Sequence, residues 1–290
     1  MTYKLSIIAT AHRPQNWLTF MDSLGKNDID YEVIFVGPNK PVENMPSNFF
    51  YIYSLVKPAQ CVEIAYRASS GNLILIASDD VEFVGEKPLD RLVLEYKKQN
   101  NYKVVISSRL MQDGKKFELD QHLFEYQNYK YYTSSHLLSG AGIISKKVIE
   151  EVGGFDKNFI AANFAIDLDL RIYSIGGKVF MSDVLINEKK STKGFRSNTQ
   201  SEYAFHDSKL LYSLWDEDEN KRLFRNKDVE PYTHENIKIM SQGPRGRWRG
   251  TNFVIIEYLI DVPFKILKRN FRRLTSFKKY IYYLKKLFMS

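Results

Sequence analysis

The chain has 290 residues, of which 44% are apolar and 26% charged, a composition typical of a globular protein with a substantial core. Its single cysteine, Cys61, excludes an internal disulfide and a cysteine-built zinc site, and it fits a reducing cytosol. The apolar stretch 5–11 is short and lacks a cleavage pattern, and the stretch 253–260 is too short to span a bilayer. We therefore expect neither a signal peptide nor a transmembrane helix.

The first hundred residues alternate between apolar runs typical of buried strands and stretches typical of helices. We expect strands over 5–9, 31–36, 49–55, 72–77 and 104–107, and helices over 14–24, 58–70 and 88–99. A proline opens each of these helices, at the position where its missing N–H costs nothing. This rhythm predicts an α/β fold with a mostly parallel sheet and helices on both faces.

After residue 112 the alternation becomes looser. We expect helices over 147–152 and 167–175, a strand over 178–181 and a polar, mobile loop over 186–201. For the domain organisation we expect a catalytic-type domain over 1–215, a helical and loop extension closing on the site over 216–263, and a tail over 264–290.

The tail is defined by its charge. Residues 264–290 contain nine lysines and arginines and no acid; since the whole chain carries +8 and this stretch +9, the preceding residues sum to −1. Apolar and aromatic residues recur in the tail at helical spacing, so it reads as a basic amphipathic helix suited to an anionic membrane surface. The alternative is a C-terminal helix packed on the domain itself. Nucleic acid is not expected, because nothing upstream resembles a base-reading module.

The run Ser78-Asp79-Asp80 is the most informative short feature. Two adjacent carboxylates follow the expected strand 72–77, at the sheet edge where open α/β sheets bind ligands. Adjacent acids repel each other, and a divalent cation removes that conflict; oxygen ligands suit Mg²⁺ or Mn²⁺. Taken alone, the pair fits a solvated turn equally well.

Four segments in order across residues 4–182 resemble the family 2 glycosyltransferases, which have the GT-A fold. The segment 6–14, ending Thr10-Ala11-His12-Arg13-Pro14, looks like the family's first strand and turn, and 65–80 like the helix, strand and Asp-x-Asp position. Residues 139–156, with Gly142 and the run Gly-Gly-Phe-Asp, resemble its acceptor-side segment. Asp167-Leu168-Asp169-Leu170 stands where the family carries Glu-Asp-x-Asp-Leu.

The resemblance implies a donor site for a nucleoside diphosphate sugar, with uridine the expected base. Asp80 would be the ligand of Mn²⁺ or Mg²⁺, and Asp79 would contact the ribose or a metal-bound water. The other side chains expected to face the nucleotide are Thr10, His12, Arg13, Lys57, Arg67 and, on a loop that would close over the diphosphate, Arg245. Arg13 and Arg67 are equally compatible with surface roles, and the loop with a basic hinge to the tail.

The resemblance also implies an inverting attack by an acceptor hydroxyl, which needs a general base. Asp167 is the candidate, and Asp169, about 200° away on a helix at ~100° per residue, would cap the first turn or orient the acceptor. Complementing the helix N-terminus is the simpler alternative for both acids.

The sequence departs from the family at several positions. His12 replaces the usual Asn, Ile166 the Glu of the last motif, and Tyr173 a frequent Arg, while the second strand ends in Gly37-Pro38-Asn39 instead of acids. These changes leave base and ribose recognition open.

Together these features predict a metal-dependent glycosyltransferase that acts in surface polysaccharide biosynthesis. It would be cytoplasmic and peripherally bound to the inner face of the plasma membrane, with a saccharide or lipid-linked saccharide as acceptor. A nucleotidyltransferase is the enzymatic rival, but it would have no need of the segments 153–156 and 167–170. The alternative from another class is a catalytically silent GT-A domain serving as a membrane-tethered scaffold subunit.

Overall fold

The structure is a computed structural model, and it describes residues 4–40, 42–112, 115–116, 123–126, 129–132, 142–188, 206–220 and 222–233. Nine strands of this part form one sheet: β1 (Lys4–Thr10), β2 (Asp30–Gly37), β3 (Phe49–Tyr53), β4 (Leu73–Ser78), β5 (Val81–Val84), β6 (Val104–Gln112), β7 (Lys115–Lys116), β10 (Gly142–Ser145) and β11 (Lys178–Glu188). Its helices are η1 (Pro14–Asn16), α1 (Trp17–Leu24), α2 (Pro58–Ala68), α3 (Pro88–Lys98), α5 (Lys146–Glu151) and α6 (Phe164–Ser174), and helical turns also cover 206–214.

The sheet is mixed and largely parallel, in the order β3-β2-β1-β4-β10-β6-β11-β5, with β7 paired to β6. Strands β1 to β4 are mutually parallel, β10 runs antiparallel to both β4 and β6, and β5 runs antiparallel to β11. Because β1 pairs in parallel with both β2 and β4, the carboxyl ends of these three strands meet at one edge. We call this edge the carboxylate edge.

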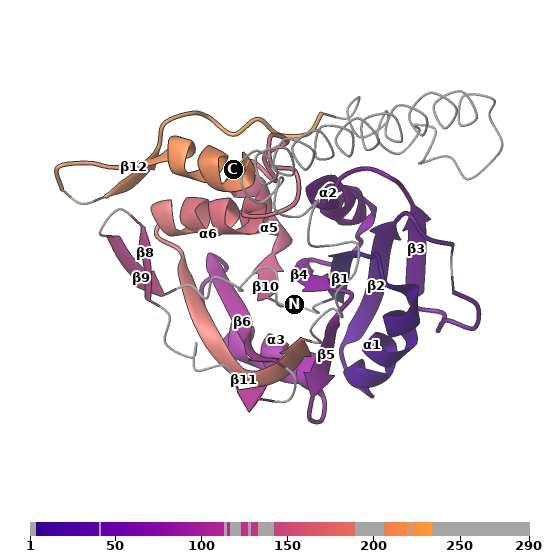
Figure 1. The fold of residues 1–290 in the computed structure, drawn as a ribbon. Helices are drawn as coiled ribbons and strands as arrows, with labels where there is room; N and C mark the ends of the chain where they lie inside the picture. The colour runs from indigo at the N-terminus through magenta and orange to yellow at the C-terminus, as the bar shows by residue number, and fades with distance from the viewer. Residues whose placement is uncertain are drawn as a thin grey trace, which may run out of the picture.

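Helices cover both faces of the sheet (Figure 1). On one face α1 and α3 bury residues such as Trp17, Phe20 and Leu92 against β1, β4 and β5. On the other face α2, α5 and α6 bury Ile64 and Leu168 with their neighbours. The predicted α/β architecture is therefore confirmed.

A third apolar cluster extends the second face. It joins α6 to the helical residues 206–214 and to a hairpin of β12 (Trp215–Glu217) and β13 (Leu223–Arg225). The hairpin lies beside α6 in Figure 1. A separate two-stranded sheet pairs β8 (Leu123–Tyr126) with β9 (Tyr129–Tyr132).

Glycine permits the close approach of β1 and the chain that leads into β4. A Cβ on Gly71 would lie 2.6 Å from the Ser6 hydroxyl and 2.8 Å from the Lys4 carbonyl oxygen. The Gly71 N–H instead donates to the Ser6 Oγ at 2.8 Å, and the buried Glu32 carboxylate accepts the Ser6 hydroxyl at 2.6 Å. Only a residue without a side chain lets β4 start in register with β1 here.

Three expectations differ from the structure. Residues 186–188, expected to begin a polar loop, belong to β11, which continues to Glu188 because β5 and β6 pair with it. Strand β5 was not expected at all, and α6 begins at Phe164, three residues early. Strand β12 spans residue 215, and β13 lies within the described part of the expected helical and loop extension 216–263.

Much of the expected C-terminal organisation lies outside the described residues. This applies to the tail 264–290, to Arg245 and its loop, and to the remainder of the polar loop from 189 to 201. Within the described ranges, no helix combines the length and the apolar character needed to cross a membrane.

Candidate active site

The carboxylate edge brings the first two sequence motifs together. Thr10, the last residue of β1, pairs in register with Ser78, the last residue of β4. Asp79 and Asp80 follow at once, and both are buried, at 1% and 3% exposure. The turn after β1 therefore lies directly against the two carboxylates.

Asp79 is surrounded by donors from that turn. Its Oδ2 accepts the backbone N–H groups of His12, at 2.6 Å, and of Arg13, at 2.5 Å, and the indole N–H of Trp17 at 3.4 Å. Its Oδ1 accepts the Arg13 Nη1. Four protein donors match the roughly four lone-pair sites of a carboxylate, so Asp79 acts as the anchor of the turn.

Arg13 links the two acids. Its Nη1 contacts Asp79 and its Nη2 lies 2.7 Å from the Asp80 Oδ2, while Asp80 also accepts the Ser78 hydroxyl. The side chains of all three charged residues are largely buried, at 13% exposure for Arg13 and 2% for each acid. One guanidinium therefore balances part of the charge of the two carboxylates. From the sequence we expected only a metal ion to do so.

The end of β2 is shaped by a close backbone contact. A Cβ on Gly37 would lie 1.8 Å from the carbonyl oxygen of Ala11, and the Ala11 N–H donates to Val36 at 2.8 Å. The Tyr51 hydroxyl donates to the Gly37 carbonyl at 2.6 Å and accepts the Asn39 N–H at 3.0 Å. This packing gives a physical reason for the missing acids, because the first position after Val36 has no room for a side chain.

Of the other residues expected to face the nucleotide, some lie near the carboxylate edge and one does not. The Thr10 Oγ1 lies 3.3 Å from the His12 Nε2. The exposed Lys57 is the N-cap residue of α2 and follows the end of β3 by four residues. Arg67 lies at the opposite end of α2, where its Nε contacts Glu63 at 2.7 Å and its Nη2 the Tyr232 carbonyl at 3.0 Å. The structure thus does not bring Arg67 to the carboxylate edge.

Gly142 lies at that edge from the other side. It is the first residue of β10, is buried, and pairs with Ile76 of β4 and Ser107 of β6. Since β10 runs antiparallel to β4, its start lies where β4 ends.

Asp167 belongs to a buried ion-pair cluster. Its Oδ1 accepts Trp215 Nε1 at 3.0 Å and Arg225 Nε at 3.1 Å, and its Oδ2 accepts Arg171 Nε at 2.9 Å. Arg225 also contacts Asp156. Asp167 and Asp169 are both fully buried. Burial lowers the pKa of the Arg171 guanidinium, with the Asp167 carboxylate opposing that shift.

Sequence reasoning missed most members of this cluster. Arg171 follows Asp167 by four residues on a predicted helix, so the i,i+4 pairing rule would have found it. Trp215 and Arg225 carried no such signal, because they lie 48 and 58 residues away from Asp167 in the chain.

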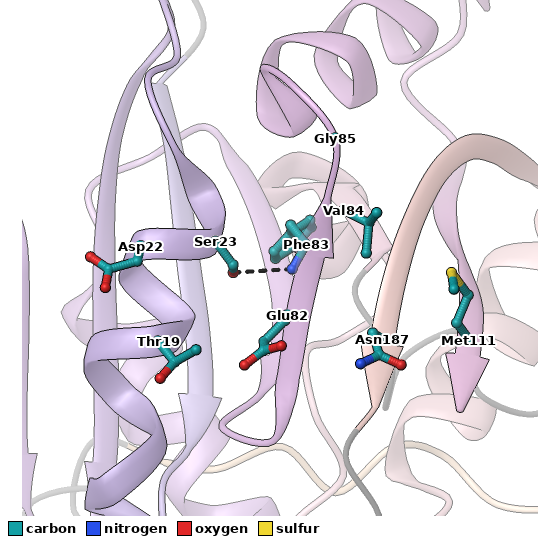
Figure 2. A pocket seen from close by; sticks show the side chains of 9 residues that line it. All are labelled: Thr19, Asp22, Ser23, Glu82, Phe83, Val84, Gly85, Met111 and Asn187. Carbon is teal, nitrogen blue, oxygen red and sulfur yellow. Dashed lines mark hydrogen bonds between the residues drawn. The ribbon is translucent and has the colours of Figure 1, made fainter. Parts of the chain in front are cut away.

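A cavity of about 550 Å³ lies between α1, β5 and the ends of β6 and β11 (Figure 2). Thr19, Asp22, Glu82 and Asn187 are among its lining residues, and neither Asp79 nor Asp80 is. None of the residues expected for the site lines this cavity.

Neither the family models nor the curated proteins include a match to this chain. Solved structures do match. The S. aureus TarS 1–349 structure in complex with UDP-GlcNAc aligns with a TM-score of 0.50 at 13% identity, over 67% of this chain and 61% of that one. The fold is GT-A-like. The mannosyltransferase PcManGT from Pyrobaculum calidifontis, in complex with GDP-Man and Mn²⁺, aligns with a TM-score of 0.49 at 14% identity, over 72% and 64%.

The matched structures are longer than the region of similarity. This chain spans less than two thirds of the length of either one. The GT-A-like fold confirms the resemblance noted in the sequence at the level of architecture.

The donor chemistry of the GT-A-like site fits a hard divalent cation that is shared with a substrate. Within the described ranges, no group of three or more His, Cys, Asp or Glu side chains could enclose a metal ion. Asp80, the residue expected to ligate Mn²⁺ or Mg²⁺, is contacted by the Arg13 Nη2 and by the Ser78 hydroxyl. Such ions commonly take their remaining ligands from water and substrate phosphates.

Proposed function

We propose that this chain is a glycosyltransferase that uses a nucleoside diphosphate sugar. The observation that carries the proposal is the pair Asp79 and Asp80 at the end of β4, held against the β1 turn by Arg13 in a GT-A-like fold. Open α/β sheets bind ligands at such an edge, and the pair supplies carboxylate oxygens there. TarS, with UDP-GlcNAc, and PcManGT, with GDP-Man and Mn²⁺, carry nucleotide sugars.

In this proposal each residue of the carboxylate edge has a separate role. Asp80 holds a divalent cation, which supplies Lewis-acid stabilisation of the departing diphosphate. Asp79 keeps the turn and Arg13 in place, and Thr10, His12 and Lys57 border the nucleotide. Gly142 leaves room for the acceptor near the end of β4.

Asp167 remains the proposed general base of an inverting reaction. Two guanidinium groups and the Trp215 N–H occupy both of its oxygens. Arg225 comes from the β12–β13 hairpin, so a shift of the hairpin would expose Oδ1. Asp169, two residues further along α6, would orient the acceptor.

Asp167→Asn tests this assignment. The amide keeps the size of the side chain but cannot accept the proton, so we expect sugar release and transfer to fall at least 100-fold while nucleotide-sugar affinity changes less than threefold. Radiolabelled sugar release and calorimetric binding measure the two quantities, and circular dichroism checks folding. Unchanged turnover in a folded variant would exclude Asp167 as the base.

The burial of Asp167 favours a second candidate, a catalytically silent GT-A domain that binds nucleotides as a scaffold subunit. This candidate predicts metal-dependent nucleotide binding and no sugar release with any acceptor. Transfer that depends on Asp80 would rule it out.

The proposals for the acceptor and for the location of the protein rest on the charge of the tail 264–290. Nine basic residues without an acid over 264–290 support binding to an anionic membrane surface. A saccharide or lipid-linked saccharide at the inner face of the plasma membrane is then the proposed acceptor, in the synthesis of a surface glycan.

A further inference from the structure

Arg13 occupies the position where the charge of the carboxylate pair is greatest. Its guanidinium contacts Asp79 through Nη1 and lies 2.7 Å from the Asp80 Oδ2 through Nη2. The two acids carry two negative charges and Arg13 one positive charge, so a net charge of −1 remains within this buried set.

The two contacts of Arg13 are not equivalent. Asp79 also accepts the backbone N–H groups of His12 and Arg13, which fix the main chain of the turn. Rotation of the Arg13 side chain leaves both of these bonds intact. The contact between Arg13 and Asp80 is therefore the one that can be exchanged for another anion without unfolding the turn.

A divalent cation and Arg13 compete for Asp80. A lone ion beside Asp80 would meet the positive guanidinium within a few ångströms, and like charges at that distance repel each other. A diphosphate changes this balance, because its oxygens can accept the guanidinium bidentately and can also ligate the cation. Each ligand then favours the binding of the other.

We propose that Arg13 is the built-in counter-cation of the carboxylate pair and that it passes from Asp80 to the diphosphate when a nucleotide binds. Divalent metal and nucleotide therefore bind cooperatively, and Arg13 sets the size of the coupling. The inference rests on the proposed function, since it takes a nucleoside diphosphate as the ligand.

The test measures Mn²⁺ binding to the full chain by the loss of the free-ion electron paramagnetic resonance signal, with and without UDP or GDP. For the native protein we expect Mn²⁺ affinity to rise at least tenfold when the nucleoside diphosphate is saturating. For Arg13→Gln we expect Mn²⁺ alone to bind at least tenfold more tightly than to the native protein, and the coupling to fall at least threefold; the coupling that remains comes from direct ligation of Mn²⁺ by the phosphates.

Two further variants keep the result interpretable. Arg222→Gln removes an exposed arginine that pairs with Asp218 and should behave as the native protein. If Arg13→Gln does not fold, Arg13→Lys keeps the positive charge without the planar fork, so we expect weak binding of Mn²⁺ alone and a coupling reduced at least threefold.

The outcomes separate the two levels of the proposal. Nucleotide binding whose coupling to Mn²⁺ is unchanged in the Arg13 variants would overturn this inference and leave the proposed function standing. The same holds for Mn²⁺ affinity in Arg13→Gln that is equal to or below that of the native protein. No binding of any nucleotide to the native protein with Mn²⁺ would overturn the proposed function itself.

Discussion

Asp79 and Arg225 each bind groups that lie far apart in the sequence. Asp79 gathers the turn after β1, and Arg225 joins Asp156 to Asp167. In both cases a buried charge is compensated by opposite charges and by hydrogen bonds, as burial of an ion requires. At the scale of single residues, the candidate site is therefore built from ion pairs that constrain the loops around it.

Glu63 is a buried acid of a different kind. Burial raises its pKa to about 7, and the hydrogen bond from Arg67 opposes the shift. Tyr66 and Tyr232 are the other titratable groups close to it. Between about pH 4.5 and 7 the unfolded chain releases this proton while the folded protein keeps it, so the free energy of unfolding falls as the pH rises through that window.

Glu63→Gln should remove this loss. Gln cannot ionise. We therefore expect the free energy of unfolding of the variant, minus that of the native protein, to rise by about 2–3 kcal/mol as the pH goes from 5 to 8. Urea unfolding at several pH values measures the difference. Glu150→Gln, at an exposed position about one turn along α5 from Lys146, serves as the control and should show no such trend. If this difference in the free energy of unfolding does not change with pH for Glu63→Gln either, burial does not raise the pKa of Glu63.

At the scale of elements, the β12–β13 hairpin is attached to α6 through charge as well as through apolar packing. Trp215 and Arg225 both donate to Asp167, and the side chain of Arg225 is only 8% exposed. The hairpin thus packs on α6 through buried polar contacts as well as through the apolar cluster.

Arg225→Gln should destabilise the fold strongly. The change leaves two buried carboxylates with fewer donors, and breaking a buried pair typically costs about 3–5 kcal/mol. Arg222→Gln, on the same hairpin but with a side chain 74% exposed, should cost less than about 1 kcal/mol. Chemical denaturation compares the two, and equal losses would show that the cluster contributes little to stability.

Elements with a strong local pattern were predictable, and those that depend on distant pairing were not. Strand β4 and helix α2 match the expected ranges within two residues, since apolar runs, Pro58 and Gly71 fix them locally. Strand β5 and the second half of β11 are strands because they pair with each other across about a hundred residues. No local period encodes that pairing.

In the candidate site, too, the parts encoded by local motifs were predictable and those that depend on distant contacts were not. The carboxylate pair, Thr10 and Arg13 meet as the motif order implies, because parallel strands end at one edge. The surroundings of Asp167 were not predictable, since Trp215 and Arg225 reach it from a hairpin that carries no motif. Arg67 was expected at the nucleotide because of its helix, but a helix has two ends and Arg67 lies at the far one.

At the scale of the whole molecule, the segments proposed for the donor and the acceptor lie at one sheet edge, and the basic stretch 264–290 follows the described fold in the sequence. The proposed membrane role of that stretch and the proposed transfer reaction are independent of each other. Removing the tail would test only the first, whereas the carboxylate pair tests the second.

The most direct measurement is calorimetric titration of the native protein and of Asp80→Asn with UDP- and GDP-linked sugars, with and without Mn²⁺. The account predicts that one of these donors binds the native protein with micromolar to millimolar affinity only when Mn²⁺ is present, and that Asp80→Asn loses at least tenfold of that affinity while remaining folded. Binding that is indifferent to both Mn²⁺ and Asp80, or no binding of any nucleotide sugar, would contradict it.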